Sequence, residues 1–200
     1  MAAAPRGRAQ RRTIFSITRR IPARRRSQIF SWKMKTSLAY KMMKSPVGEI
    51  KLVASAEALM AVLWGNSAPG HARFAEATED PSHPVLRQAE RQLADYFAGK
   101  LKVFSLKLDF TGTDFQKVVW QALLTIPYGE TRSYREVAAQ IGNPKAVRAA
   151  GGAIGRNPIS IIAPCHRVLG ASGQLTGFAG GLAVKSLLLE IESCAVLKSS

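Results

Sequence analysis

Two short helical segments joined by Gly-Asn-Pro at residues 142–144 constrain the fold of this chain more than any other feature. They lie within residues 131–148, and Pro144 stands where proline is favoured, at the first position of a helix. We therefore expect the second segment to begin at Pro144 and the pair to form a helix-turn-helix. Such a motif serves either as a packing unit or as a DNA-binding element, and both interpretations stay open at this point.

The second segment is rich in small residues, which allow a backbone to come close to another surface, including a groove of DNA. Its glycines cost about 1 kcal/mol each relative to alanine, which indicates that close approach is favoured over helix stability. One long cation, Arg148, stands among them. The small residues are Ala146, Ala149, Ala150, Gly151, Gly152 and Ala153.

One of the two cysteines, Cys165, precedes His166 and Arg167. A thiol is a poor nucleophile until a neighbouring group lowers its pKa or takes its proton. In an extended segment adjacent side chains point to opposite faces, so His166 meets Cys165 only if the backbone turns or a water bridges them. A lone Cys-His pair is equally compatible with a small, buried apolar cysteine.

The residues around Cys165 resemble the active-site segment of the O6-alkylguanine-DNA alkyltransferases, in their free-standing bacterial form. The resemblance runs from about residue 115 to about residue 192. It is carried by Gly-Arg-Asn-Pro at 155–158, Pro-Cys-His-Arg-Val at 164–168, Gly-Phe-Ala-Gly-Gly-Leu at 177–182, and the lysine and leucines that follow.

This resemblance implies direct-reversal DNA repair. The protein would flip O6-alkylguanine, and also O4-alkylthymine, out of duplex DNA, because the alkyl carbon is hidden inside the base stack. It would then transfer the alkyl group irreversibly to Cys165, so that each molecule acts once. The enzyme class is that of methylated-DNA–protein-cysteine S-methyltransferases.

The same resemblance assigns roles to individual residues. His166 takes the thiol proton through a water, and Glu192 orients the histidine, with Glu190 as the nearest rival. Tyr134 binds the flipped base, while Arg148 fills the gap in the stack from a helix in the minor groove. The other expected substrate- or DNA-binding residues are Asn157, which ties the recognition helix to the active-site turn, and Val168, Phe178, Ala179, Lys185, Ala146 and Ala149.

Position 178 departs from the family pattern, because it is phenylalanine where many members have tyrosine. A hydroxyl contact from this position is therefore absent, although the ring can still form a pocket wall. The preference for methyl or larger alkyl groups, and for guanine or thymine lesions, stays open.

The sequence patterns and the resemblance together predict an α+β protein with two domains. Residues 36–108 would form a small N-terminal α/β domain of ribonuclease-H-like shape and structural role. We expect a turn at 45–48, a hairpin of strands at 50–54 and 58–65, a loop over 66–83, a helix from Pro84 that Gly99 ends, and a strand over 103–108.

Residues 109–200 would form a mostly helical C-terminal domain that binds DNA and carries out the transfer. Its first helix is capped by Thr113 or Asp114 and ends near residues 127–129. We expect its apolar residues to lie on one core-facing side. These residues are Phe115, Val118, Val119, Ala122 and Leu123.

Most of the net charge of +16 lies in residues 1–35, which hold nine arginines, two lysines and no acidic residue. We expect a basic, disordered tail. Three interpretations remain open: a targeting segment, an arm that adds nonspecific DNA affinity, or sequence upstream of a natural start at Met34.

Other classes of protein fit the sequence less well. No apolar run reaches the roughly 20 residues that cross a bilayer, so we expect no membrane association. Two cysteines do not form a disulfide framework, and His71 and His83 are expected at the surface, which leaves no zinc-ligand cluster. We therefore expect no metal or cofactor.

The expected partner is double-stranded DNA that carries O6-alkylguanine. We expect a monomer in the cytoplasm, or in an organelle or the nucleus if the basic tail is a targeting signal. The alternative function is a protein that binds alkylated DNA without transfer and flags the lesion for other repair factors. A cysteine hydrolase would need a base and an oxyanion hole from elsewhere in the fold, for which the sequence gives no sign.

Overall fold

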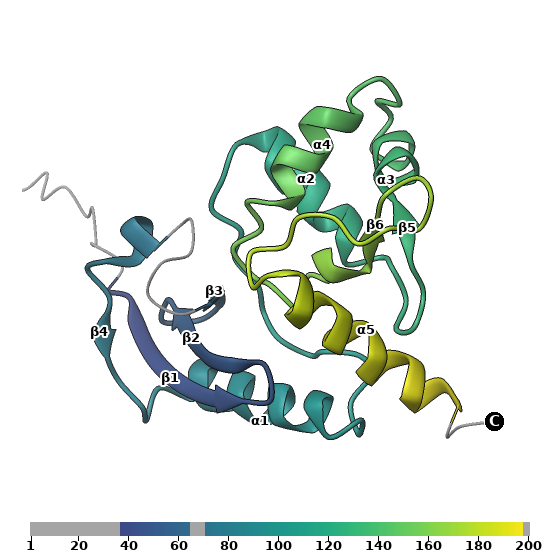
Figure 1. Ribbon diagram of the computed structural model, residues 1–200. Helices are drawn as coiled ribbons and strands as arrows, with labels where there is room; N and C mark the ends of the chain where they lie inside the picture. Colours follow the sequence, from purple (N-terminus) through teal and green to yellow (C-terminus); the bar gives the residue numbers. More distant parts are fainter. Residues whose placement is uncertain (1–36, 65–70, 198–200) are drawn as a thin grey trace, which may run out of the picture. The chain divides into compact units, whose positions relative to one another are not determined.

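The computed structural model describes residues 37–64 and 71–197, which belong to one compact unit that spans residues 35–200 (Figure 1). The predicted basic tail at 1–35 and Met34 lie outside the described residues, and so does part of the predicted loop at 66–83. The architecture is α+β, as predicted: a four-stranded sheet with one long helix is followed by a mostly helical part.

The sheet has the strand order β3-β2-β1-β4, with β4 parallel to β1 and the other pairs antiparallel. The predicted hairpin is present as β2 and β3, and the predicted turn at 45–48 joins β1 to β2. Strand β1 is not predicted from the sequence, because Lys41 and Lys44 interrupt its apolar alternation. The strands are β1 (Ala39–Ser45), β2 (Gly48–Ala54), β3 (Leu59–Trp64) and β4 (Thr78–Glu79).

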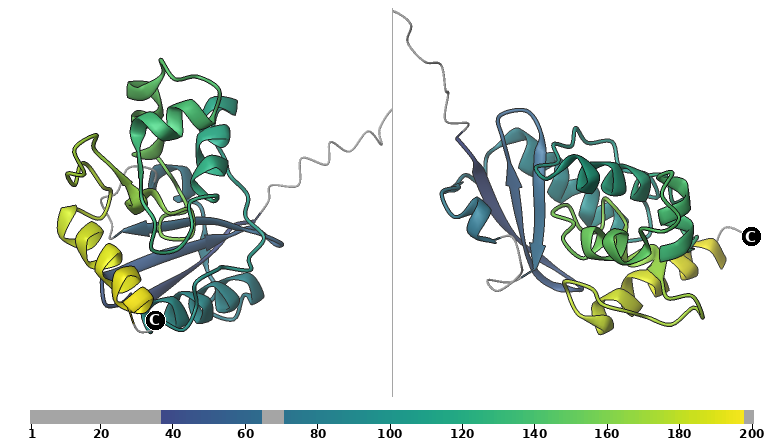
Figure 2. Two further views of the ribbon diagram at one scale, coloured as in Figure 1. Left: turned by 90° about the vertical axis from the view of Figure 1, so that its right-hand side faces the viewer. Right: turned by 90° about the horizontal axis from the view of Figure 1, so that it is seen from above.

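Helix α1 (Pro84–Phe97) runs along one face of the sheet (Figures 1 and 2). As the sequence predicts, proline begins this helix, and Gly99, with a φ of 70°, follows its C-cap. Its buried apolar residues share one hydrophobic core with the sheet. They are Leu86, Ala89, Leu93 and Tyr96.

The predicted strand over 103–108 is wrong. Only Leu108 forms a bridge, to Leu59, and Val103 is 78% exposed. The reason is the side chain of Gln92 in α1, which accepts a hydrogen bond from the backbone N–H of Ser105 at 2.8 Å and donates one to its carbonyl at 2.9 Å. A side chain therefore takes the backbone groups that a neighbouring strand would otherwise bind.

The predicted loop at 66–83 is also wrong in part. Within residues 71–83 the chain forms a short 3-10 helix, η1 (His71–Phe74), and the two-residue strand β4. Phe74 is buried against the sheet face opposite α1, which anchors this connection.

The C-terminal part begins with helix α2 (Asp114–Leu123), which Thr113 caps through a reciprocal pair of hydrogen bonds with Gln116. The predicted cap is therefore present, but the helix ends at Leu123 and does not reach residues 127–129. Its predicted core-facing side is partly wrong, because Phe115 is 37% and Val118 45% exposed.

The predicted helix-turn-helix is present as α3 (Tyr134–Gln140) and α4 (Val147–Ile154). Pro144 was expected to begin the second helix, but this expectation is wrong, because α4 begins at Val147. Pro144 lies in the turn before α4. A hydrogen bond of 3.0 Å closes this turn, from the backbone N–H of Ala146 to the carbonyl of Asn143. Helices α2, α3 and α4 pack against one another (Figure 2).

The segment before Cys165 joins two hydrophobic cores. Ile159, Ile161 and Ile162 pack with the sheet and α1, whereas Ala163 and Cys165 pack with α2, α3 and α4. The chain then continues through η2 (Cys165–Arg167), β6 (Val168–Leu169), which pairs in parallel with β5 (Arg132–Ser133), and α5 (Leu182–Leu197).

Within residues 37–64 and 71–197, no helix combines the length and apolar character needed to cross a bilayer. The described part of the chain also holds no group of three His, Cys, Asp or Glu side chains that could bind a metal ion.

Candidate active site

The backbone makes two tight turns just before Cys165. The N–H of Ile162 donates to the carbonyl of Ser160 at 2.9 Å across Ile161, whose φ is 70°. The N–H of Cys165 donates to the carbonyl of Ala163 at 2.8 Å. A β-branched residue at positive φ is a strained exception, and such strain gathers at functional sites.

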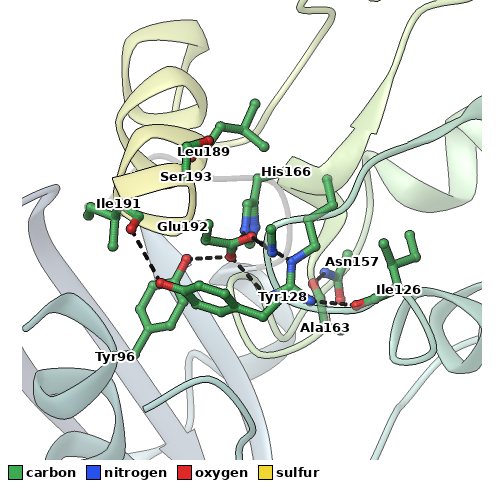
Figure 3. Close-up of polar contacts among 12 residues, drawn as sticks. Tyr96, Ile126, Tyr128, Asn157, Ala163, His166, Leu189, Ile191, Glu192 and Ser193 are labelled. Carbon is green, nitrogen blue, oxygen red and sulfur yellow. Dashed lines mark hydrogen bonds and ion pairs between the residues drawn. The ribbon is translucent and has the colours of Figure 1, made fainter. Parts of the chain in front are cut away.

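Glu192, in the middle of α5, is the centre of a buried polar network (Figure 3). Its Oε1 lies 2.7 Å from Nε2 of His166, and both side chains are 1% exposed or less. Arg167 binds the same carboxylate through two nitrogens, Nε and Nη2, each at 2.9 Å. The rival carboxylate of Glu190 is exposed and contacts Ser186.

The charges in this network fix which nitrogen of His166 carries the proton. Burial by itself would raise the pKa of Glu192, but hydrogen bonds and charge from His166 and Arg167 outweigh it and hold that pKa at about 2. The ionised carboxylate can only accept hydrogen bonds, so Nε2 of His166 must donate.

Nδ1 of His166 is then the unprotonated nitrogen. It is buried and has no hydrogen-bond partner among the residues that the structure describes. Burial also lowers the pKa of His166, against the opposing effect of Glu192, so the ring is neutral at neutral pH. A neutral imidazole with a free lone pair is a proton acceptor.

Cys165 lies in the same turn as His166 and is only 6% exposed. Burial raises the pKa of its thiol, while hydrogen bonds with Asn157 and Ser160 and the charge of Lys185 act in the opposite direction. The thiol is therefore protonated at neutral pH and needs a base before it can react as a thiolate.

Lys185 ties the chain after Cys165 to the following loop. Its ammonium group is buried and donates to the carbonyl of Val168 at 2.6 Å and to the carbonyl of Thr176 at 3.0 Å. Burial lowers the pKa of this lysine, and the nearby thiol group of Cys165 raises it.

A pocket of about 570 Å³ opens between α3, α4 and the loop before α5. The hydroxyl of Tyr134 lies 2.9 Å from Oγ1 of Thr176 within its wall. Cys165 is not part of the lining, but it packs in one hydrophobic cluster with Tyr134 and Phe178. The lining residues are Tyr134, Val147, Arg148, Gly151, Gly155, Gly170, Thr176, Gly177, Phe178 and Ala179.

The small residues of α4 divide between two sides of the helix. Ala149 is exposed and Ala146 is half-buried, in agreement with an outward-facing surface. Ala150 and Ala153 are buried against α2 and α3, so these two residues let α4 approach its neighbouring helices and do not face a groove of DNA. Arg148 is exposed at the pocket rim.

Three residues of this region were not expected from the sequence. Arg167 stands in the motif, but its neighbours do not reveal that it binds Glu192. Tyr96 donates to Glu192 from α1, although its spacing there is that of an ordinary core residue. Thr176 contacts Tyr134 from a loop without any pattern.

Two family models cover most of the chain. Residues 38–110 match the 6-O-methylguanine DNA methyltransferase ribonuclease-like domain, and residues 114–194 match the 6-O-methylguanine DNA methyltransferase DNA binding domain. The chain belongs to the 6-O-methylguanine DNA methyltransferase family. The resemblance and the fold class inferred from the sequence are thereby confirmed.

Individual relatives in the family are similar over most of their length. A methylated-DNA–protein-cysteine methyltransferase of Methanosarcina acetivorans is 51% identical over 158 residues, which are 78% of this chain and 99% of that protein. One from Mycobacterium leprae is 60% identical over 119 residues, which are 60% of this chain and 72% of that protein.

Solved structures agree with these sequence relationships. The crystal structure of Mycobacterium tuberculosis O6-methylguanine methyltransferase has a TM-score of 0.73 at 49% identity and covers 79% of this chain and 94% of that one. The structure of the Mycobacterium tuberculosis protein in complex with DNA also has a TM-score of 0.73, at 48% identity, with coverage of 78% and 94%.

Proposed function

We propose that this protein repairs alkylated DNA by direct reversal, as a methylated-DNA–protein-cysteine S-methyltransferase. It binds double-stranded DNA, flips O6-alkylguanine or O4-alkylthymine into its pocket, and transfers the alkyl group to Cys165. The thioether that results does not hydrolyse, so each molecule reacts once. Membership of the family and the names of its relatives support this proposal.

One observation carries the proposal: a buried thiol and a base of defined protonation share one turn. The proton on Nε2 of His166 is held by Glu192, which leaves Nδ1 as the acceptor for the proton of Cys165, through a bridging water. Glu192 also stabilises the imidazolium that forms. Because Arg167 neutralises part of its charge, the carboxylate stays ionised inside the protein.

The chemical step is a direct displacement. The sulfur of Cys165 forms a bond to the alkyl carbon, and the bond between that carbon and O6 breaks, with its electron pair left on the guanine. The thiol gives its proton to His166, and the guanine gains one proton as it leaves. One thiol and one lesion therefore yield one thioether and one unmodified guanine.

The pocket residues would recognise the extruded base. In this proposal Tyr134 exchanges its contact with Thr176 for the base, while the ring of Phe178 and the backbone near Ala179 form the wall. Val168, whose carbonyl Lys185 holds, presents main-chain groups to the base edge. Asn157 keeps the end of α4 in register with the turn at Cys165.

DNA contacts would come from the outer side of α4. Ala146 and Ala149 allow the helix to approach the minor groove, and Arg148 enters the stack in place of the flipped nucleotide. Binding of this kind depends on phosphate contacts and DNA deformation more than on base sequence.

The same proposal assigns the parts of the chain. Residues 36–108 form the N-terminal domain, residues 109–200 form the DNA-binding and transfer domain, and residues 1–35 form a basic tail. The protein acts as a monomer, because every residue assigned to the reaction comes from one chain. It acts in the cytoplasm, where a thiol stays reduced.

Intact-mass spectrometry tests this function. The purified protein is incubated with a duplex that carries one O6-methylguanine, and the modified peptide is then mapped. We expect one methyl group per molecule, on Cys165, and none on the Cys165→Ala variant, which should still bind the duplex. Protein that retains the duplex without modification would favour the lesion-binding alternative, and methyl transfer by the variant would contradict Cys165 as the nucleophile.

A further inference from the structure

We propose that Tyr96, in helix α1, is a positioning residue for alkyl transfer, and that its hydroxyl holds Glu192 in the orientation that His166 needs. The inference rests on the proposed function, since it gives Tyr96 a part in that reaction. It also gives the N-terminal part of the chain, which the sequence predicts to be structural in role, a direct hydrogen bond to Glu192, the carboxylate that binds His166.

The carboxylate of Glu192 accepts five hydrogen bonds. Its Oε1 is shared by the hydroxyl of Tyr96 at 2.8 Å, Nε2 of His166 at 2.7 Å and Nη2 of Arg167 at 2.9 Å (Figure 3). Its Oε2 accepts from Nε of Arg167 at 2.9 Å and from the N–H of Gly129 at 3.2 Å. Of these donors, only Tyr96 belongs to the part of the chain before residue 110.

The direction of the bond from Tyr96 is fixed by charge. Glu192 is ionised and can only accept, so the tyrosine hydroxyl must donate. Burial raises the pKa of Tyr96, and the charge of Glu192 raises it further, so the hydroxyl keeps its proton. Hydrogen bonds to a charged acceptor are the stronger kind.

The ring of Tyr96 is held firmly enough to orient a partner. It is fully buried, and its centroid lies 5.5 Å from those of Phe97 and Phe104 and 6.1 Å from that of Tyr128. Because these contacts lock the ring, the hydroxyl has one position relative to α5. A reacting group works best when the residues behind it are fixed in this way by packing.

The role of this hydroxyl is orientation of Oε1. The same oxygen binds His166, so rotation of the carboxylate would also turn the imidazole ring. The proton on Nε2 and the lone pair on Nδ1 would then both change direction. Tyr96 does not line the pocket, and its hydroxyl binds Glu192 and not Cys165. Loss of its hydroxyl should therefore slow the transfer step and leave DNA binding unchanged.

The test compares Tyr96→Phe with Tyr128→Phe. Both variants remove one hydroxyl from the same aromatic cluster, but the hydroxyl of Tyr128 donates to the carbonyl of Ile191, at 3.3 Å, and not to Glu192. We measure the single-turnover rate constant at saturating O6-methylguanine duplex, the Kd for an unmodified duplex, and the Tm. For Tyr96→Phe we expect a rate constant lower by about tenfold, with an unchanged Kd. For Tyr128→Phe we expect a rate constant within about twofold of that of the wild type.

A double-mutant cycle separates orientation from loss of packing. If Tyr96 acts through Glu192, then Tyr96→Phe should change the rate constant by less than about twofold in a Glu192→Gln background. If the effect of Tyr96→Phe were purely structural, its decrease in the rate constant would instead multiply with the decrease caused by Glu192→Gln. Such an effect would also lower the Tm and would not be confined to the transfer step.

The outcomes separate this inference from the function on which it rests. A wild-type protein that fails to transfer methyl would overturn both. A wild type that transfers, together with a Tyr96→Phe variant of equal rate, would overturn the inference alone. Equal decreases in the rate constant for Tyr96→Phe and Tyr128→Phe would also overturn it. So would an undiminished effect of Tyr96→Phe in the Glu192→Gln background, because the effect would then arise from the packing of the aromatic cluster.

Discussion

The side-chain amide of Asn157 donates a hydrogen bond of 2.8 Å to the carbonyl of Ala163, two residues before Cys165 (Figure 3). Its carbonyl oxygen accepts one of 3.1 Å from the N–H of Ile159. The amide thus binds both ends of the segment that contains Ile161 at a φ of 70°. Since this backbone is strained, the two hydrogen bonds help to hold it.

Asn157→Ala should destabilise the fold and slow the transfer. The change leaves the buried N–H of Ile159 without its acceptor and removes one of the two hydrogen bonds that the carbonyl of Ala163 accepts, which costs about 1–3 kcal/mol. Urea denaturation gives the free energy of unfolding, and single-turnover kinetics give the rate. The control is Asn143→Ala, because that side chain is exposed. Equal stability of the two variants would contradict the role of Asn157.

Gly180→Ala should be destabilising because two aromatic rings confine this glycine. A Cβ at Gly180 would lie 3.0 Å from the ring of Trp64 and 3.1 Å from the ring of Phe178. The rings themselves meet edge to face, with centroids 5.5 Å apart. We expect a loss of about 1–3 kcal/mol in the free energy of unfolding, as for other overpacked sites. Gly177→Ala, where a Cβ meets nothing within 4 Å, is the control, and an equal loss there would refute the steric explanation.

Local signals explain which parts of the fold could be predicted. Helix α1 begins at a proline and ends before a glycine, and α2 has a threonine cap, so both were predictable from their own residues. The segment at 103–108 has the alternation of a strand, but its backbone partner is the side chain of Gln92, which lies more than ten residues away. A proline such as Pro144 is as compatible with the first position of a helix as with the turn in which it lies.

The candidate site was predictable only where residues stand together in the chain. Cys165 and His166 are adjacent, and the resemblance to a family supplied Glu192. The contact of Tyr96 with Glu192 spans 96 positions. On α1 this tyrosine has the spacing of a core residue, so no sequence pattern separates a packed ring from a ring whose hydroxyl also binds a buried carboxylate.

Arg148→Ala should affect duplex substrates more than a free base. Arg148 is exposed at the rim of the pocket, and its proposed role is to fill the stack that the flipped nucleotide leaves. We expect transfer from an O6-methylguanine duplex to fall by about tenfold or more, because unstacking costs a few kcal/mol. Reaction with free O6-benzylguanine, measured by intact mass, should stay within about twofold of the wild type.

Lys145→Ala provides the matched control for Arg148. Lys145 is exposed in the turn before α4, so its loss should weaken DNA binding mainly through the salt-dependent term. Equal losses on duplex and free base in Arg148→Ala would contradict a role in base flipping, since a free base requires none.

The buried network predicts how stability depends on pH. Glu192 has a pKa of about 2 in the folded protein against an ordinary value of 4.5, so the unfolded chain binds a proton there first as the pH falls. The stability that this carboxylate contributes is present above pH 4.5 and is lost between 4.5 and 2. Burial lowers the pKa of His166 from 6.5, so its contribution is lost from pH 6.5 downward.

Glu192→Gln should flatten the acid part of this dependence. We expect the free energy of unfolding of the wild type, measured in urea, to fall by about 3 kcal/mol on full protonation of Glu192. The variant lacks this group, so between pH 4.5 and 3 its slope should be shallower, although it is less stable at pH 7 because Arg167 then lies buried without its carboxylate. Glu190→Gln, on the exposed side of α5, should keep the wild-type slope. A wild-type slope in Glu192→Gln would mean that other carboxylates control acid unfolding.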